Sequence, residues 1–400
     1  MKKDYQGKKV LMRVDFNVPL DENNNITDDT RIRAALPTIQ ALLDRNAAII
    51  LMSHLGRPLK NKKADGSIDR EKFSLEHLVD HLATLLGQSV QFAHDTVGEE
   101  AQKKSARLEA GQVLLLENTR FEEGEKTGDK ELARKMSELA DYYINDAFGT
   151  AHRAHASTTA VAQFFDQDHK SFGLLMEKEL KNAERLRSDP DKPYTAIIGG
   201  AKVSDKIGLL ENLLGKCDYI LVGGGMAYTF FRAYGGKVGN SLVEEDKLEL
   251  ANELMHNATR KHTEIILPQD SVIADQFSNE AETETVVSDH IPEGWMGLDI
   301  GKKAIKKFSN IIIKSKTVMW NGPMGVFEMD KFAAGSIAVA KAMAEASRRG
   351  AFTMVGGGDS VSAVNQSGEA DKISFISTGG GAMLEYLEGK TLPGVAAISD

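Results

Sequence analysis

The chain has 400 residues, of which 42% are apolar and 27% are charged, a composition typical of a globular protein rather than of a disordered or fibrous one. Its net charge of −9 works against binding to nucleic acid or to an anionic membrane, so a bound anion needs a local basic cluster. The single cysteine, Cys217, excludes an intramolecular disulfide, and its place before an apolar run predicts a buried side chain rather than a nucleophile. No apolar segment resembles a signal peptide or is long enough to cross a membrane, which predicts a cytoplasmic protein.

Short apolar runs, each followed by a polar or glycine-rich turn, recur along the chain. Because the runs are continuous rather than alternating, they predict parallel strands buried on both faces and separated by helices, the pattern of an α/β protein. The predicted strands cover residues 10–14, 48–52, 113–116, 142–144, 195–198, 219–222, 264–267, 317–320, 352–355 and 373–376.

Two helices are indicated by apolar spacing and by their ends. Residues 75–86 have helical spacing and precede Gly87, which predicts a glycine cap at the carboxyl end. A charged helix over 171–189 stops before Pro190 and Pro193, because proline cannot continue a helix. We interpret it as the connection between two α/β domains.

Basic side chains gather where the predicted strands of the first half end, in the order Arg13, His54, Arg57, Arg120, His152, Arg153 and His155, with Arg31 opening the first helix. The carboxyl ends of parallel strands meet at one edge of a sheet, so these residues predict a site for a small, highly charged anion. Asp15 and Asn17 would receive its hydroxyls or orient the arginines. A metal site built on the histidines is the weaker alternative, because the neighbouring arginines repel a cation.

Glycine-rich turns follow the strands of the second half, at 199–200, 223–225, 356–358 and 379–381. Glycine lets the backbone approach phosphate, and Lys202 and Lys206 add positive charge, so these turns predict a mononucleotide site. Asp359 is either a Mg²⁺ ligand or the N-cap of a helix, and the residues alone leave both open. The P-loop and dinucleotide motifs are absent.

Long segments of the chain resemble the phosphoglycerate kinase family. They include Arg13-Val-Asp-Phe-Asn-Val-Pro19, Met52-Ser-His-Leu-Gly-Arg-Pro58 and the segments 145–155, 199–206, 223–226, 320–328, 356–359 and 377–382. The resemblance implies two doubly wound, Rossmann-like parallel-sheet domains facing a cleft: a 3-phosphoglycerate domain over 1–170, the helix over 171–189, a nucleotide domain over 190–385 and a tail over 386–400 that returns to the first domain. It also implies a monomer that transfers a phosphoryl group reversibly between 1,3-bisphosphoglycerate and MgADP in glycolysis and gluconeogenesis.

The resemblance also implies the site residues. The glycerate substrate would be held by Asp15, Asn17, Arg31, His54, Arg57, Arg120 and Arg153. MgATP would be held by Gly199, Lys202, Lys206, Gly223, Gly224, Gly297, Leu298, Asn321, Pro323, Glu328, Gly356, Gly357, Gly358, Asp359 and Ser360. Within this set Glu328 would take the ribose hydroxyls, Asp359 the Mg²⁺, and Gly223, Gly224, Gly297 and Leu298 the adenine. Ser360 replaces a threonine common in the family, Thr119 and Met324 also differ from the usual side chains, and 234–246 and 276–289 match less clearly.

The implied reaction needs no general base, because its acceptor is a carboxylate that is already ionised at neutral pH. We expect Arg31, Lys202 and the helix start at Gly379 and Gly380 to neutralise the transferring group, with domain closure and no covalent intermediate. Two rival functions are a two-lobed protein that only captures a phosphorylated metabolite, and a kinase for another acidic sugar.

Overall fold

The computed structural model describes residues 3–399. The chain divides into two compact units, which we treat separately: unit 1 comprises 1–181 with 391–400, and unit 2 comprises 182–390. Helix α6 (Leu174–Ser188) carries the chain from one unit to the other. It stops before Pro190, as the sequence predicts.

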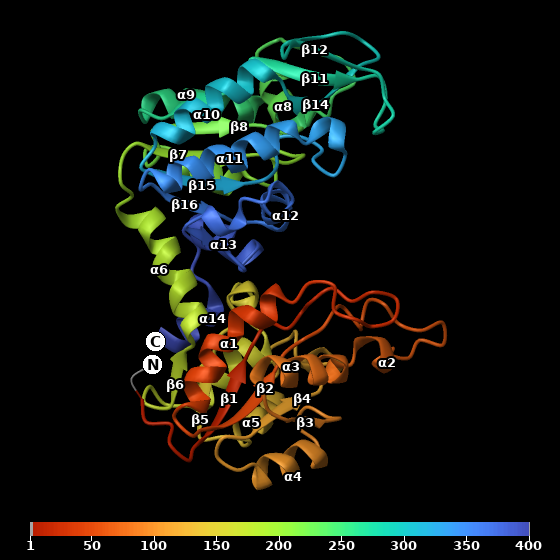
Figure 1. The fold of residues 1–400 in the computed structure, drawn as a ribbon, viewed down its shortest axis with the longest axis vertical. Helices are drawn as coiled ribbons and strands as arrows, with labels where there is room; N and C mark the ends of the chain where they lie inside the picture. The colour runs from red at the N-terminus through yellow and green to blue at the C-terminus, as the bar shows by residue number, and fades with distance from the viewer. Residues whose placement is uncertain (1–2, 400) are drawn as a thin grey trace. The chain divides into compact units, whose positions relative to one another are not determined.

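Unit 1 is built on a six-stranded, wholly parallel sheet (Figure 1). Its spatial order is β3 (Val90–Ala93), β4 (Val113–Leu116), β2 (Ala48–Met52), β1 (Lys9–Arg13), β5 (Tyr142–Asn145) and β6 (Lys170–Phe172). The strand order reverses beside β1, since β2 and β5 lie on its two sides. Ligands bind beyond the carboxyl ends of the strands at such a switch point.

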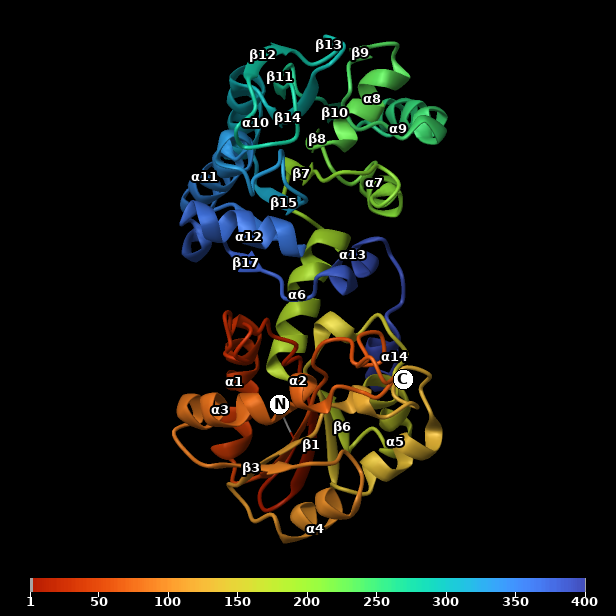
Figure 2. The same ribbon diagram turned by 90° about the vertical axis from the view of Figure 1, so that its right-hand side faces the viewer.

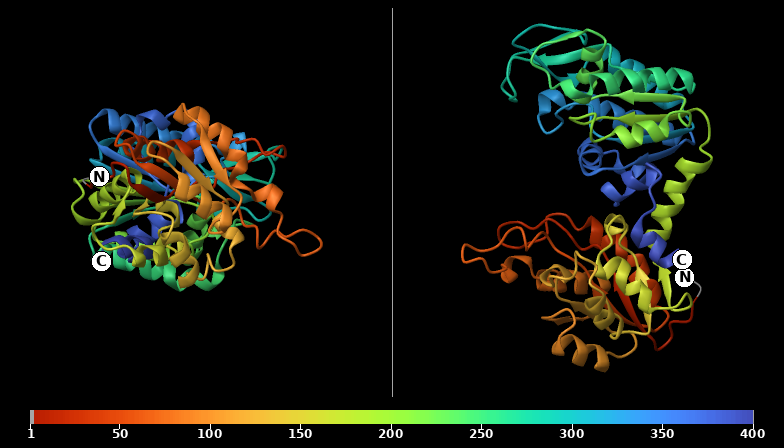
Figure 3. Two further views of the ribbon diagram at one scale, coloured as in Figure 1. Left: turned by 90° about the horizontal axis from the view of Figure 1, so that it is seen from below. Right: turned by 180° about the vertical axis from the view of Figure 1, so that it is seen from behind.

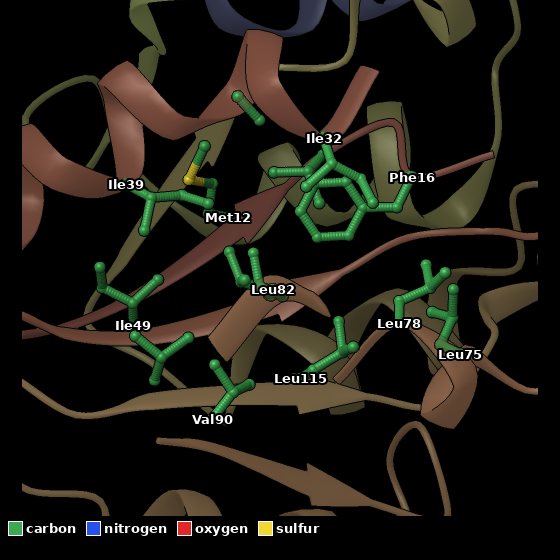
Figure 4. Packing of buried hydrophobic residues seen from close by; sticks show 14 of the residues in the cluster. Met12, Phe16, Ile32, Ile39, Ile49, Leu75, Leu78, Leu82, Val90 and Leu115 are labelled. Carbon is green, nitrogen blue, oxygen red and sulfur yellow. The ribbon is translucent and has the colours of Figure 1, made fainter. Parts of the chain in front are cut away.

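Both faces of this sheet are covered by helices (Figure 2). One face carries α1 (Thr30–Leu43), η1 (Leu75–Leu78) and α3 (Val79–Leu86), and the other carries α4 (Glu99–Arg107), α5 (Lys130–Ser137), η4 (Ala156–Ala160) and η5 (Val161–Phe164). Successive strand residues point to opposite faces, so Met12 packs with Ile32 and Ile39 (Figure 4), whereas Leu11 packs in the opposite cluster. The remaining short elements are α2 (Arg70–Phe73), η2 (Thr119–Phe121) and η3 (Phe148–Thr150).

The carboxyl-terminal helix α14 (Pro393–Ser399) belongs to unit 1. The Gly394 amide donates to the Ala151 carbonyl at 2.8 Å, and Asn145 Nδ2 donates to the Gly394 carbonyl at 3.3 Å. Helix α14 lies beside β6 (Figure 3). Lys170 of β6 bonds to segments near both ends of the chain, because its Nζ donates to the Ala397 carbonyl at 2.8 Å and its own carbonyl accepts from Lys3 Nζ at 2.6 Å. The tail therefore packs on the turn that follows β5.

Unit 2 repeats the architecture with the strand order β10 (Glu264–Ile266), β8 (Tyr219–Val222), β7 (Tyr194–Ile198), β15 (Thr317–Asn321), β16 (Phe352–Val355) and β17 (Phe375–Ile376), all parallel. Its switch point lies between β7 and β15. One face carries α10 (Lys302–Lys314), α11 (Ala334–Arg348) and α12 (Gly358–Ser367), and the other carries α7 (Ile207–Leu213), α8 (Met226–Ala233), α9 (Leu248–Arg260) and α13 (Gly381–Leu387) (Figure 2).

Beside this sheet, unit 2 has a three-stranded antiparallel sheet of β12 (Thr283–Val287), β11 (Asp270–Ala274) and β14 (Met296–Ile300). A small ladder pairs β13 (His290–Ile291) with β9 (Lys237–Val238), and short turns occur at η6 (Glu245–Lys247), η7 (Asp330–Phe332) and η8 (Ala370–Lys372).

The predicted fold class, with two parallel-sheet domains joined by a helix, is confirmed, and every predicted strand is present. The strand predicted over 373–376 is shorter, because η8 occupies the residues before it. The single helix predicted over 75–86 is divided into η1 and α3, and it ends at Gly87 in the left-handed conformation (φ 68°), as predicted. No helix among residues 3–399 is long and apolar enough to span a membrane.

Candidate functional site

A cluster of basic side chains lies at the carboxyl edge of the unit 1 sheet. Arg13 ends β1, His54 and Arg57 follow β2, Arg120 lies in η2 after β4, Arg153 follows η3, and Arg31 lies in the first turn of α1. Lys126 and His155 join them, and we call these eight residues the basic cluster. The predicted basic residues of the first half are therefore at this edge, with His152 accepting from Arg153 Nε at 3.0 Å, whereas Lys126 was not singled out from the sequence.

Hydrogen bonds fix the turns that carry the cluster. Asp15 Oδ2 accepts from Arg31 Nη1 at 2.9 Å. Asn17 Oδ1 accepts from the Gly56 amide at 2.8 Å, and Arg120 Nη1 donates to the Gly56 carbonyl at 2.6 Å. The turn after β2 is thus held from the ends of β1 and β4.

Arg13 has a different position from the one expected for a residue that grips an anion. It is 0% exposed, and its guanidinium donates to Ser157 Oγ at 2.8 Å, to the Val14 carbonyl and to His54. Ser157 in turn bonds Glu125, a carboxylate that is also 0% exposed, through Oγ at 2.5 Å and through its amide at 3.0 Å. The prediction that Arg13 contacts the anion is therefore wrong, because its guanidinium is fully buried and donates to acceptors inside the protein.

This buried network determines which nitrogen of His54 carries the proton. Arg13 Nη2 lies 3.1 Å from His54 Nδ1, and a guanidinium can only donate, so Nδ1 must be the acceptor. The ring proton is then on Nε2, which has no hydrogen-bond partner among the described residues. His54 is buried, and it offers a neutral N–H donor rather than a charge.

Few negative charges balance the basic cluster. Burial and then the Arg13 charge lower the pKa of His54 well below its ordinary value, and burial and then Arg120 lower the pKa of His155 to about 4. Burial, Arg13 and Arg153 lower the pKa of Arg120 to about 10. A bound anion would reduce the repulsion among these cations. The basic cluster is therefore suited to bind an anion.

In unit 2 the turns after β7, β8 and β15 pack backbone against backbone at the switch point. The Gly199 amide donates to the Asn321 carbonyl at 2.9 Å, and the Gly224 amide donates to the Met324 carbonyl at 3.0 Å. A Cβ on Gly199 would lie 2.1 Å from the Pro323 carbonyl oxygen. Gly199 is therefore required by close packing of the turns, whereas its sequence position suggested direct approach to phosphate.

The glycines at two helix starts are different. Gly358 begins α12 and Gly380 caps α13, and a Cβ on either would meet no atom within 4 Å. These backbone amides border open space, so an anion can approach them.

A cavity of about 490 Å³ adjoins these turns. It is lined by predicted nucleotide residues, Gly224, Gly297, Leu298, Pro323, Glu328 and Asp359, and by Gly200, Ala201, Gly225, Asn240, Leu242, Phe277, Met296, Gly325 and Val326. Its size and largely apolar lining suit a small organic ligand with a flat ring. Sequence reasoning missed Leu242 and Phe277, although both are large apolar side chains in the segments that match the family less clearly, and Phe277 is 61% exposed.

Polar predicted residues gather beside the cavity. Lys206 Nζ donates to Asn321 Oδ1, Asn321 Nδ2 donates to the Gly356 carbonyl at 2.8 Å, and Ser360 Oγ accepts from the Gly322 amide at 2.6 Å. Burial lowers the pKa of Lys206, and Asp359 is among the carboxylates that oppose this shift. Gly223 and Gly357 lie in the same turns, and Lys202 is exposed in the turn after β7 but does not line the cavity.

Asp359 is the second residue of α12, and the N-cap is Gly357, so the alternative that Asp359 is the N-cap is wrong. Its carboxylate is exposed and borders the cavity. Residues 3–399 contain no group of three or more His, Cys, Asp or Glu side chains that could hold a metal ion. A cation there would take one protein carboxylate and complete its coordination with phosphate and water, as Mg²⁺ commonly does.

Cys217 is 2% exposed, and burial raises the pKa of its thiol, which agrees with the predicted buried side chain.

Comparisons with known proteins give a consistent result. The family described as phosphoglycerate kinase matches residues 1–390. The chain is 52% identical to a phosphoglycerate kinase from Porphyromonas gingivalis, over 99% of this chain and 98% of that one, and 54% identical to a cytosolic phosphoglycerate kinase from Nicotiana tabacum, over 99% and 96%. Its structure is similar to that of phosphoglycerate kinase from Coxiella burnetii (TM-score 0.87, 37% identity, 100% and 97% covered) and from Pyrococcus horikoshii (TM-score 0.83, 31% identity, 99% and 97% covered). The chain therefore belongs to the phosphoglycerate kinase family, the enzymes that transfer a phosphoryl group reversibly between 1,3-bisphosphoglycerate and ADP.

Proposed function

We propose that this chain performs the family reaction with the glycerate substrate bound by the basic cluster of unit 1 and the nucleotide bound in the cavity of unit 2. The observation that carries the first half of the proposal is the concentration of arginine at one sheet edge of a protein with a net charge of −9. Only a small polyanion gains from so much local positive charge.

In unit 1 the arginines provide charge and the other residues provide direction. The glycerate substrate is held by Asp15, Asn17, Arg31, His54, Arg57, Arg120 and Arg153. His54 contributes its Nε2–H, because Arg13 occupies Nδ1. The Asp15 carboxylate orients Arg31 through their 2.9 Å ion pair. The exposed Arg57 and Arg153 can follow a phosphate group as it binds.

In unit 2 the apolar part of the cavity takes the adenine between Gly224, Gly297 and Leu298, and Glu328 accepts from the ribose hydroxyls. The phosphates reach Lys202, Lys206 and the open amide at Gly358. Mg²⁺, held by Asp359 and phosphate oxygens, supplies charge neutralisation when it is bound. Gly199, Asn321 and Ser360 keep the turns in place through the bonds described above.

The transfer itself needs positioning and charge neutralisation rather than acid–base chemistry. The acceptor in the ATP-consuming direction is a carboxylate, so no proton has to be removed, and the donor and acceptor oxygens must be brought into line. We propose that Arg31, Lys202 and the amides near Gly379 and Gly380 neutralise the equatorial oxygens. Direct transfer requires the two bound substrates to meet, so the proposal includes closure of the two domains, by a monomer acting in the cytoplasm like its cytosolic relatives.

The test is turnover of MgATP and 3-phosphoglycerate in a dehydrogenase-coupled assay. Wild type should be active, and Arg31→Ala and Lys202→Ala should each lower kcat by about 10² to 10³, the usual cost of one such donor. Arg33→Ala is the matched control for Arg31, because Arg33 lies on the same helix, is exposed and pairs with Asp29 on the surface. Binding of both ligands without turnover would support the capture protein, and activity only with other acidic sugars would support a different kinase.

A further inference from the structure

A buried carboxylate lies directly beneath the proposed nucleotide cavity. Asp299 is in β14, next to Leu298, which lines the cavity, and Asp299 is only 2% exposed. Its Oδ1 accepts from the Ile300 amide at 2.8 Å, and its Oδ2 accepts from the Gly335 amide at 2.8 Å. Gly335 is the second residue of α11, so Asp299 caps the start of that helix from a neighbouring strand.

The segment 325–335, which we call the Glu328 loop, is attached to β14 at both ends. At its start the Val326 amide donates to the Leu298 carbonyl at 2.9 Å, and at its end the Gly335 amide donates to Asp299. A Cβ on Gly325 would lie 2.4 Å from Asp299 Oδ1, so the carboxylate also touches the first turn of the loop. Asp299 therefore contacts both ends of the segment that carries Val326 and Glu328 to the cavity.

The middle of the Glu328 loop is also held, since Phe327 is buried and Lys331 Nζ donates to the Ala281 carbonyl at 2.9 Å. Phe332 is fully buried and packs with Leu298, Ala274 and Ala281. Glu328 itself is exposed at the cavity rim, and its side chain makes no hydrogen bond or ion pair with another residue of 3–399. The direction in which Glu328 points therefore depends on these contacts and on the two held ends of its loop, both of which Asp299 touches.

Burying the Asp299 carboxylate costs folding free energy. No cation among residues 3–399 is paired with it, and burial raises its pKa to about 7, opposed by the bonds from Gly335 and Ile300. An exposed serine or asparagine caps most helix starts without that cost. A buried carboxylate has the advantage that it accepts strongly at two points at once.

We propose that Asp299 is a positioning residue for the nucleotide, fixing the Glu328 loop so that Glu328 reaches the ribose hydroxyls. The inference rests on the proposed function, because it assigns the cavity to a nucleotide. Asp299 touches no substrate, and its effect passes through Gly325 and Gly335 to Glu328.

The unit offers a matched control in Asp270. It lies on β11, beside β14 in the same sheet, is 5% exposed, and caps α10 by accepting from the Lys303 amide at 3.1 Å and from the Ala304 amide at 2.8 Å. Asp270 does not line the cavity or contact the Glu328 loop. Asp270→Asn and Asp299→Asn therefore make the same chemical change at the same kind of cap.

The experiment compares kcat/KM for ATP and for 2′-deoxyATP in wild type, Asp299→Asn, Asp270→Asn and Glu328→Gln. An amide at 299 places an N–H against a backbone donor, so we expect KM for ATP to rise about tenfold or more and the preference for ATP over 2′-deoxyATP to fall to that of Glu328→Gln. KM for 3-phosphoglycerate should stay unchanged, and Asp270→Asn should keep the wild-type preference. The combination of Asp299→Asn with Glu328→Gln should add little to either single change.

An unchanged ATP preference in Asp299→Asn would overturn the inference and leave Asp299 a structural cap only. Absence of ATP turnover in wild type would instead refute the proposed function, so the two failures are distinguishable. If Asp299→Asn does not fold, Gly335→Ala gives the same test, because its Cβ would lie 2.3 Å from Asp299 Oδ1 and displace the loop with the charge intact. That variant should lose the ATP preference in the same way, and retention of the preference would overturn the inference.

Discussion

The assignment of the ring proton of His54 leads to a prediction that two similar substitutions should differ strongly in their effect on substrate binding. In a glutamine at this position the side-chain amide nitrogen reaches about as far as Nε2, and in an asparagine the amide group replaces the nearer Nδ1. His54→Gln therefore keeps a donor where the substrate is proposed to bind. His54→Asn keeps an acceptor for Arg13 and removes the donor.

The expected size follows from the chemistry of the bond. A hydrogen bond to a charged partner is worth about 1.5–3 kcal/mol, which corresponds to roughly 10- to 150-fold in binding. His54 is 3% exposed, so solvent would replace the missing donor poorly. We expect KM for 3-phosphoglycerate to rise by that factor in His54→Asn and by less than about fivefold in His54→Gln, with KM for ATP unchanged in both.

The assay is steady-state turnover at constant ionic strength, since added anions would compete for the basic cluster. His94→Asn is the control, because His94 is an exposed histidine whose side chain pairs with Glu100 away from the cluster. Equal losses in the glutamine and asparagine variants would refute the reasoning, since they would show that the position of the donor does not matter. A larger loss in His54→Gln would indicate that the proton is on Nδ1.

Three other predictions concern stability, pH and the nucleotide. Gly199→Ala should lower the melting temperature by several degrees, because its Cβ would lie 2.1 Å from the Pro323 oxygen, whereas Gly358→Ala should leave it within about two degrees and raise KM for ATP. The pKa of His155 is about 4 in the folded protein and ordinarily 6.5, so the neutral ring favours folding fully above pH 6.5, and this stabilisation is lost as the pH falls towards 4. The loss in the free energy of unfolding is up to roughly 3 kcal/mol. The free energy of unfolding measured in urea should therefore depend less on pH in His155→Asn than in wild type over this interval. Lys206→Met should raise KM for ATP about tenfold or more and leave KM for 3-phosphoglycerate unchanged, and equal changes in both would contradict the proposed division of the ligands.

The parallel sheets were predictable because their strands are buried on both faces and therefore read as unbroken apolar runs. The strands that were missed lack this signal. β12 is a largely exposed edge strand whose first three residues, Thr283-Glu-Thr285, are polar, and β6 is a short edge strand that begins with Lys170. The segment 276–289 that matched the family less clearly contains β12 and Phe277 of the cavity wall.

The position of the site was predictable from the strand ends, but the function of individual residues within it was not. Arg13 and Arg31 look alike in the sequence, and only the fold shows that Arg13 donates to internal acceptors, among them Ser157 Oγ. Gly199 and Gly358 are also alike in sequence, yet one is packed against Pro323 and the other borders open space. What separates them is contact with residues far away in the chain, which a local pattern does not contain.

Both units place a buried carboxylate behind the groups proposed to meet the ligand. In unit 1 Glu125 holds Ser157, Ser157 accepts from Arg13, and Arg13 donates to His54. Each of these hydrogen bonds satisfies a buried polar atom that would otherwise cost folding free energy. Removing one side chain therefore leaves its partner buried without a hydrogen bond and weakens the whole network. A site built in this way orients its donor before the substrate arrives, and the energy that binding would otherwise spend on ordering the donor remains for affinity. Because Glu125 itself is fully buried, its replacement by glutamine should reduce 3-phosphoglycerate binding through His54 without removing any group that the substrate touches.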